Sequence, residues 1–320
     1  MKKLVQMLVL VLVAAIAGLF VVLTQKSAVE KIVPWWVNRQ ALAVEVHDLK
    51  ISRQVFQFPD NVRFEKVSLT IRQEKKDHNL EIDTINVRKV LNLLRGDQPA
   101  LLEMAAIEVR SSDMEVRQGF LQLALKSSSR GEEKVSGHAR VNLLRQGEYR
   151  LTDISADISG DLALWRFANF FAQFYGGHLR GEILLDSKNQ MVYSVHMQVE
   201  KVDLKKLETV NPEFFSNIKG SVVGSVDITA TPSEIRSISA NFSADKSGEI
   251  KALLLNYLLQ YIPANSSQRK DLEKLIKSDG NVFLDRAAVE IKSLTDEKLS
   301  SRIKLFSERF NLDVDVTLDV

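Results

Sequence analysis

The chain has 320 residues, of which 45% are hydrophobic and 26% are charged, a composition typical of a folded protein and not of a disordered one. Its 43 basic and 41 acidic side chains give a formal net charge of +2, which argues against nucleic acid as a partner, because phosphate binding needs a clustered surplus of positive charge. The absence of cysteine excludes disulfides, thiolate metal sites and cysteine nucleophiles.

Residues 1–26 are predicted to anchor the chain in a membrane. The run from Leu4 to Leu23 is apolar apart from Gln6, and at about 1.5 Å per residue it covers about 30 Å, the hydrocarbon thickness of a bilayer. Lys2 and Lys3 precede it, which predicts a cytoplasmic N-terminus, a single pass through a bacterial inner membrane and a periplasmic body. The residues that mark this anchor are Leu4, Leu8, Leu12, Ile16, Phe20 and Leu23.

A cleaved signal peptide is the alternative reading of this segment, because Ala15-Ile16-Ala17 has the small-x-small form of a cleavage site. Cleavage there would leave an apolar new terminus, which favours the uncleaved anchor. Trp35 and Trp36 follow a short predicted helix at 27–33. They are expected either at the lipid headgroups or packed against the first strands.

Beyond residue 43 the apolar residues recur with period two, which predicts about fifteen strands in antiparallel meanders. The clearest case is 311–320, whose polar face carries Asp313, Asp315 and Asp319. These carboxylates could recruit calcium, but the pattern is more typical of a solvated face that discourages edge pairing. A slip in the alternation between Phe64 and Val67 predicts a turn or bulge.

Helices are predicted over 162–174, after Asp203, over 251–262 and over 267–277, with one short turn near 90–94. The first rests on the aromatic residues between Trp165 and Phe174, with Gly176-Gly177 ending it. The predicted fold is α+β and β-dominated: a transmembrane helix, then a long curved, mostly antiparallel β-sheet with a few helices in the C-terminal half. The predicted regions are the anchor 1–26, a β-rich region 27–160 and a C-terminal region 161–320.

The strands offer more apolar area than the helices cover. Fifteen strands make a sheet about 70 Å wide with an apolar face of about 1,200 Å², and four helices mask about 700 Å² of it. The remainder must close on itself as a sandwich or barrel core, meet a partner, or hold an apolar ligand. The residues expected to line such a groove are Val67, Leu69, Ile71, Leu121, Leu123 and Leu125.

No motif for catalysis, metal binding or a cofactor is present in the sequence. The five histidines lack the spacing of a zinc site and are expected to be solvated: His47, His78, His138, His178 and His196. There is no nucleophile elbow, P-loop or dinucleotide fingerprint. The sequence is therefore interpreted as a binding or structural protein. An enzyme would need a cleft that brings a Ser or His to carboxylates from distant positions.

A turn at Tyr175-Gly176-Gly177 precedes a strand that contains Gly181, and the strand 193–199, Val202-Asp203-Leu204 and a Gly-rich strand at 218–226 follow. This order resembles the C-terminal region of the AsmA-like family. The resemblance implies an inner-membrane-anchored periplasmic sheet with an apolar concave groove. Larger relatives of the TamB and YdbH type carry phospholipid between membranes. This chain is shorter, and it is also similar in length and layout to the GspN component of type II secretion.

Two functions are therefore expected. The first is a membrane-anchored periplasmic factor of cell-envelope biogenesis that binds or passes phospholipid, or another acyl-chain lipid, in an apolar β-groove. The second is a structural or assembly factor for secretion or outer-membrane proteins, in which a sheet edge pairs with a β-rich partner. The sequence predicts no oligomeric state.

Overall fold

The computed structural model describes residues 45–319 except 58–59, 74–75, 90–91, 93–97, 128–132, 162, 187–191, 232–233, 278–280, 296–297 and 309, together with residues 27, 30, 31, 34, 35 and 38. The predicted anchor residues, from Leu4 to Leu23, lie outside this part, as does Trp36. Trp35 is 53% exposed. A search of the described residues finds no helix that is both long enough and apolar enough to cross a bilayer.

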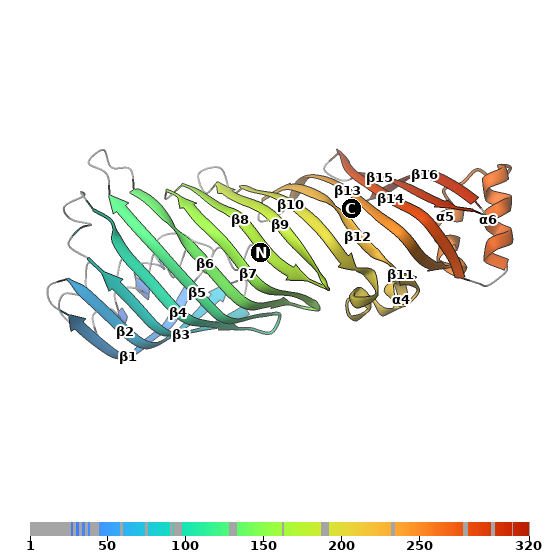
Figure 1. Cartoon of the computed structure of the whole chain (residues 1–320). Coiled ribbons are helices and arrows are strands. Elements are labelled where there is room, and N and C mark those ends of the chain that lie inside the picture. Colours follow the sequence, from blue (N-terminus) through green and yellow to red (C-terminus); the bar gives the residue numbers. More distant parts are fainter. Residues whose placement is uncertain are drawn as a thin grey trace. The chain divides into compact units, whose positions relative to one another are not determined.

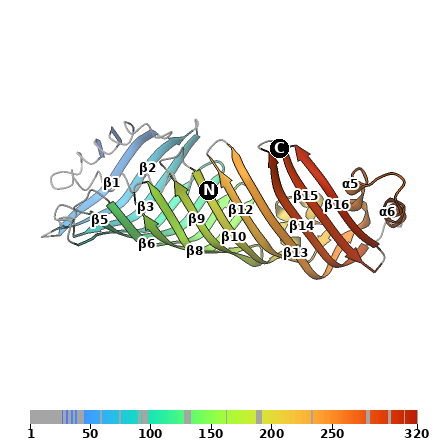
Figure 2. The same cartoon turned by 90° about the horizontal axis from the view of Figure 1, so that it is seen from above.

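The chain divides into two compact units, Met1–Ala168 and Asn169–Val320, each made mainly of long antiparallel strands. In unit 1 the strands pair in chain order and the sheet twists strongly (Figures 1 and 2). These strands are β1 (Glu45–Gln57), β2 (Asn61–Gln73), β3 (Lys76–Arg88), β4 (Ala100–Arg110), β5 (Met114–Ser127), β6 (Glu133–Gln146) and β7 (Tyr149–Gly160). The division between the units falls within β8 (Leu164–Phe174).

Unit 2 continues the antiparallel pattern and adds short helices. Its strands are β9 (Gly177–Asp186), β10 (Val192–Asp203), β11 (Ile218–Lys219), β12 (Ser221–Ala230), β13 (Ile235–Lys251), β14 (Asn281–Thr295), β15 (Lys298–Ser307) and β16 (Phe310–Asp319). Its helices are η1 (Leu204–Thr209), α4 (Pro212–Phe215), η2 (Ala252–Leu255), α5 (Asn256–Leu259) and α6 (Ser267–Lys277). The pairing order is β9-β10-β12-β13-β14-β15-β16, with β11 beside β13. The prediction of a β-dominated antiparallel fold with few helices is confirmed.

A line of left-handed residues crosses unit 1 and explains the slips in alternation. Lys66, Ala106, Gln118 and Asp153 have φ between 50° and 52°, although none is glycine. Strand pairing continues on both sides of this line. On β2, for example, the buried set changes from Val62 and Phe64 to Val67, Leu69 and Ile71. The predicted irregularity near residue 66 is thus confirmed, and it lies inside one strand instead of between two.

The inward side chains of unit 1 form apolar rows that run across the strands. One row joins neighbours from β2 to β7: Phe64, Ile85, Met104, Leu121, Ala139 and Ala156. Of these, Met104 is 0% and Leu121 is 1% exposed. This row is therefore buried over β4 and β5, whereas Ala139 on β6 is partly exposed.

The helix predicted over 162–174 is wrong, because this segment is strand β8. Aromatic side chains favour strands. Trp165 and Ala172 are both buried although Ala172 is the seventh residue after Trp165. In an uninterrupted strand, residues an odd number of positions apart point to opposite faces. Asn169, with φ at 50°, lies between them and reverses the alternation. This reversal gives the aromatic residues the spacing of a helix.

The helices predicted after Asp203, over 251–262 and over 267–277 are confirmed with small differences, whereas those predicted at 27–33 and near 90–94 lie mostly outside the described residues. Helix α6 has the predicted bounds, and Asp203 accepts a hydrogen bond from the Lys205 backbone N–H at 3.0 Å as the cap of η1. The segment predicted as a helix from 251 forms η2 and α5. These helices and α6 pack on the β14 to β16 end of unit 2 (Figures 1 and 2). The buried members of this cluster are Ala252, Leu255, Ile262, Leu272, Leu275, Val282, Leu284, Leu305, Leu312, Val314 and Val316.

Candidate functional site

Apolar side chains also form rows across unit 2, on the side of the sheet that the helices cover at one end. One row consists of Leu179, Val199, Gly224, Phe242, Val289, Ile303 and Val314. The adjacent row consists of Gly181, Met197, Val226, Ala240, Ile291, Ser301 and Val316. The rows continue from strand to strand because antiparallel partners point to the same face.

The helices cover only part of these rows. Val314 and Val316, at the β16 end, are 5% and 4% exposed and belong to the helix-covered cluster. Toward β9 some apolar side chains, such as Met197 and Ala240, are buried, but many others are only partly buried. We call this set the partly exposed inner face of unit 2, and it comprises Leu179, Val195, Val199, Val222, Val226, Ile228, Ile238, Phe242, Val289 and Ile291.

Tyr193 lies at the rim of this face. It pairs with Leu185 on β9 and with Ala230, the last residue of β12. Tyr193 is 6% exposed, and its hydroxyl has no hydrogen-bond partner within the described part of the chain. Burial raises the pKa of the Tyr193 hydroxyl, which therefore stays protonated at neutral pH.

The structure explains why each of the turn residues singled out from the sequence occupies its position. Tyr175 and Gly176, with φ at 44° and 85°, form the two-residue turn between β8 and β9, and two positive φ values are typical of a type I′ hairpin. A Cβ atom at Gly177 or Gly181 would collide with the backbone of β10. The predicted turn thus joins two strands, and not a helix to a strand.

The six residues predicted to line a groove are all buried. Val67, Leu69 and Ile71 on β2 are 6%, 5% and 0% exposed. On β5 the corresponding set is Leu121, Leu123 and Leu125, at 1%, 1% and 5%. Both sets are thus buried within unit 1, whereas the partly exposed inner face lies in unit 2. Period-two spacing could not reveal this, because it does not show what packs against a face.

The histidines are more engaged than expected. His78 is 0% exposed on β3, so its predicted place in a solvated loop is wrong. His138 accepts a hydrogen bond from Arg140 at Nε2, which leaves Nδ1 to donate to Asp157 Oδ1 at 3.0 Å. His196 forms a similar pair with Asp227. These His–carboxylate pairs resemble part of a catalytic triad, but they stand on exposed strand faces.

A shallow depression on the outer face of unit 2 lies beside His196. Phe171 contacts the ring of His178 with 5.7 Å between centroids, and the Arg180 guanidinium lies 5.7 Å from the centre of the Phe171 ring. Arg180 and His178 each lie 3.8 Å from a carboxylate oxygen of Glu200. The charges are thus balanced within the cluster, and the depression is not a concentrated anion site. The described residues include no group of His, Asp and Glu able to hold a metal ion.

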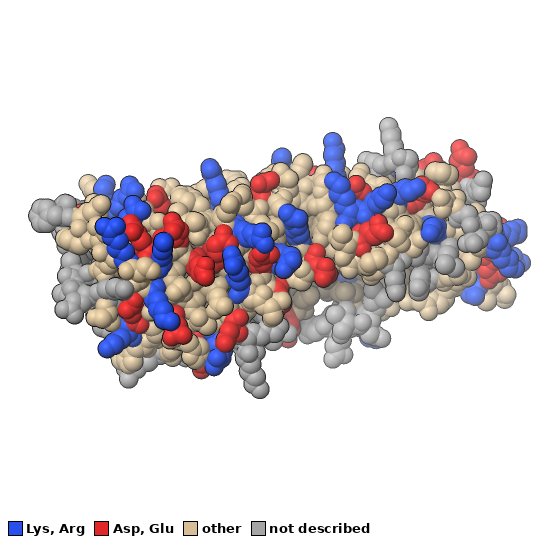
Figure 3. Space-filling view, turned by 90° about the horizontal axis from the view of Figure 1, so that it is seen from below, with Lys and Arg blue, Asp and Glu red and all other residues tan. Residues whose placement is uncertain are grey.

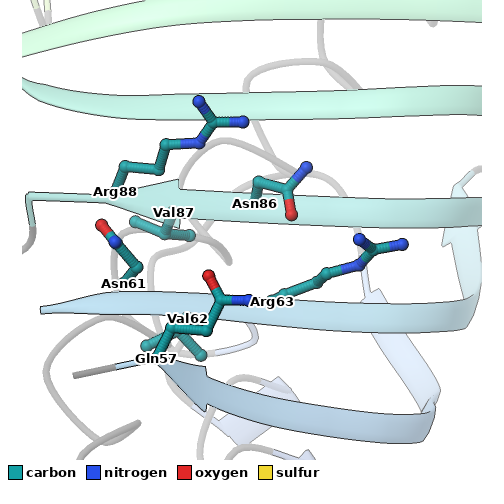
Figure 4. A pocket seen from close by; sticks show the side chains of 7 residues that line it. All are labelled: Gln57, Asn61, Val62, Arg63, Asn86, Val87 and Arg88. Carbon is teal, nitrogen blue, oxygen red and sulfur yellow. The ribbon is translucent and has the colours of Figure 1, made fainter.

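A second depression lies on β1, β2 and β3 of unit 1 and is mainly polar (Figure 4). Its arginines already have partners: Arg63 Nε lies 3.0 Å from Glu65 Oε1, and Arg88 lies 3.9 Å from Glu103. On the face seen in Figure 3, basic and acidic side chains are likewise interspersed. Cross-strand pairing of opposite charges accounts for this pattern.

The outermost strands of the two units differ in the protection of their edges. On β1, the Asn38 side chain bonds to both the N–H and the C=O of Val46, at 2.7 and 3.0 Å, and Glu30 Oε1 accepts from the Ile51 N–H at 2.7 Å. On β16, only β15 pairs with the strand in the described structure. Arg302 forms two hydrogen bonds to Asp313, at 2.8 and 2.6 Å, which lowers the pKa of that carboxyl group.

No protein-family model, curated protein or solved structure matches the chain. The resemblance to the AsmA-like family therefore stays a prediction from the sequence.

Proposed function

We propose that the protein binds an acyl-chain lipid, such as a phospholipid, along the partly exposed inner face of unit 2. We further propose that it does so as a single-pass factor of the bacterial cell envelope, with a cytoplasmic N-terminus and a periplasmic body. The observation that carries the proposal is the set of apolar rows that continue beyond the cover of the helices. Soluble surfaces rarely leave so many apolar side chains together without a ligand or partner.

The dimensions of the face suit an acyl chain. From β9 to β14 the rows cross five neighbouring strands, which at about 4.8 Å spacing is about 19 Å. One leaflet of a bilayer has a hydrocarbon depth of about 15 Å, half of the core thickness. An acyl chain that lies obliquely across the strands, with its headgroup end at the start of β10, would thus be covered along its length. No reaction is needed, because apolar contact alone stabilises the bound chain.

A glutamate placed in the middle of the face tests this proposal. Val226 lies between Met197 and Ala240, and Ser225 precedes it on the opposite side of β12. The full chain is incubated with vesicles of phosphatidylethanolamine and phosphatidylglycerol, reisolated, and its bound phospholipid is counted by mass spectrometry. We expect the wild type and Ser225→Glu to carry lipid and Val226→Glu to lose it. Equal lipid on all three proteins, or none on the wild type, would refute the proposal.

The open edge of β16 supports a second candidate function, that of an assembly factor. Asp313 and Asp315 are exposed and alternate with the buried Leu312, Val314 and Val316 along this strand. A second copy pairing antiparallel would oppose like charges, whereas a strand with alternating Lys or Arg would complement them. We expect a peptide of alternating valine and lysine to bind the full chain, as measured by fluorescence anisotropy, and a valine–glutamate peptide not to bind. Equal binding of both peptides would exclude this reading.

A further inference from the structure

The Tyr193 hydroxyl is a buried polar group that the fold itself does not explain. It is 6% exposed and lacks a partner among the described residues, and a buried hydroxyl left without a hydrogen bond destabilises the fold. A phenylalanine would fill the same space without this cost. A tyrosine at this position therefore suggests that its hydroxyl acts in binding a ligand.

Tyr193 lies near the start of β10, where the headgroup of a lipid would begin if its acyl chain lay on the partly exposed inner face of unit 2. It is the second residue of β10, and Val195, Met197 and Val199 follow it inward on the same side of the strand. Each step of two residues moves about 7 Å along the strand. The hydroxyl is thus at the rim, one row away from Val195 and Ile228 of the partly exposed inner face.

The nearby polar groups at this rim are already engaged. Thr231, which follows Ala230, is 9% exposed, and its backbone N–H donates to the Glu234 carbonyl at 2.8 Å. The Thr231 side chain bonds to the same residue. Tyr193 is accordingly the buried donor that remains available at this part of the described rim.

We infer that the Tyr193 hydroxyl donates a hydrogen bond to an oxygen of the lipid that lies on this face, and so fixes the position of the lipid along the strands. This inference rests on the proposed function. A phenolic O–H is a good donor, and the linkage region of a phospholipid offers only acceptors, the ester carbonyl and phosphate oxygens. The shared chemistry is a hydrogen-bond acceptor at the junction between acyl chain and headgroup.

The variant Tyr193→Phe tests the inference, because it removes the hydroxyl and keeps the ring. In the lipid-free chain we expect the thermal midpoint to stay the same or rise, since an unsatisfied buried group is lost. We expect the affinity for dioleoylphosphatidylglycerol to fall about tenfold. Tyr149→Phe is the matched control, because Tyr149 is 57% exposed on β7 and should change neither quantity. A purely structural role for the hydroxyl would lower the thermal midpoint of Tyr193→Phe.

A diether analogue of the same lipid, which lacks ester carbonyls, distinguishes the two acceptors. If the acceptor is the ester carbonyl, the diether binds the wild type about tenfold more weakly than the ester lipid, and Tyr193→Phe does not weaken it further. If the acceptor is the phosphate, Tyr193→Phe weakens both lipids equally. Unchanged affinity of Tyr193→Phe for both lipids would overturn the inference and leave the lipid function standing. A wild type that binds neither lipid would overturn both.

Discussion

Glycine substitutions at Ala105 and Ala106 should have opposite effects on stability, although the two alanines are neighbours on β4. Ala106 has φ at 52°, on the left-handed line that crosses unit 1, whereas Ala105 does not have a positive φ and pairs with Thr84. Ala106 is exposed and Ala105 is partly buried. The pair therefore separates backbone strain from loss of a methyl group.

The magnitudes follow from the backbone. A left-handed conformation costs a non-glycine residue about 1–2 kcal/mol. Glycine relieves this strain, but it also raises the conformational entropy of the unfolded chain, which lowers the free energy of unfolding by about 0.4–1 kcal/mol. The net expectation for Ala106→Gly is a gain of about 0.5–1 kcal/mol in the free energy of unfolding. Ala105→Gly should lose about 0.5–1 kcal/mol, because glycine weakens a regular strand.

Urea unfolding of the purified full chain in detergent micelles measures the difference. Circular dichroism follows the strand content. The urea midpoints are compared for variants whose free energy of unfolding has the same dependence on urea concentration, because only then does a shifted midpoint report a change in stability. We expect the midpoint of Ala106→Gly to lie above that of Ala105→Gly by the equivalent of about 1–2 kcal/mol. Equal destabilisation by the two substitutions would show that the left-handed line carries no strain.

Three further predictions follow from single contacts. Gly181→Ala should destabilise the chain by about 2 kcal/mol in urea unfolding, since its Cβ would collide with β10, while Gly248→Ala, whose Cβ meets nothing closer than 3.7 Å, should be near neutral. Arg302 lowers the pKa of Asp313, so this pair stabilises the fold above about pH 4 and stabilises it less as the pH falls and Asp313 takes up a proton. In Asp313→Asn, the thermal midpoint should therefore fall less between about pH 4 and lower pH than it does in the wild type. Asn38→Ala should speed hydrogen exchange of the Val46 amide about tenfold, whereas unchanged exchange would mean that the edge is protected by other contacts.

Much of the fold could be predicted from local patterns. The alternation in β2, β5, β10, β12 and β16 follows from period-two spacing, and α6 follows from its amphipathic pattern. The Tyr175-Gly176 turn could be placed because only residues that tolerate positive φ make a tight hairpin. These features depend on residues close together in the sequence, so a single chain is enough to reveal them.

Strand β8 shows where local reasoning fails. One left-handed residue, Asn169, reverses the alternation and turns a strand pattern into one that resembles a helix. Asparagine tolerates this conformation, but nothing else in the sequence marks it. Pairing with other strands, which is not visible in the local sequence, stabilises the extended form.

The sequence alone determined which side chains share a face within an uninterrupted strand, where α6 starts and ends, and that apolar residues exceed what the helices can cover. Only the tertiary structure decided which of these faces closes into a core and which stays partly exposed. Leu121 and Val226 both belong to alternating runs, yet Leu121 is 1% exposed and Val226 remains partly exposed. The physical reason is that burial depends on what packs against a face, and the alternation within a strand does not show which elements do so.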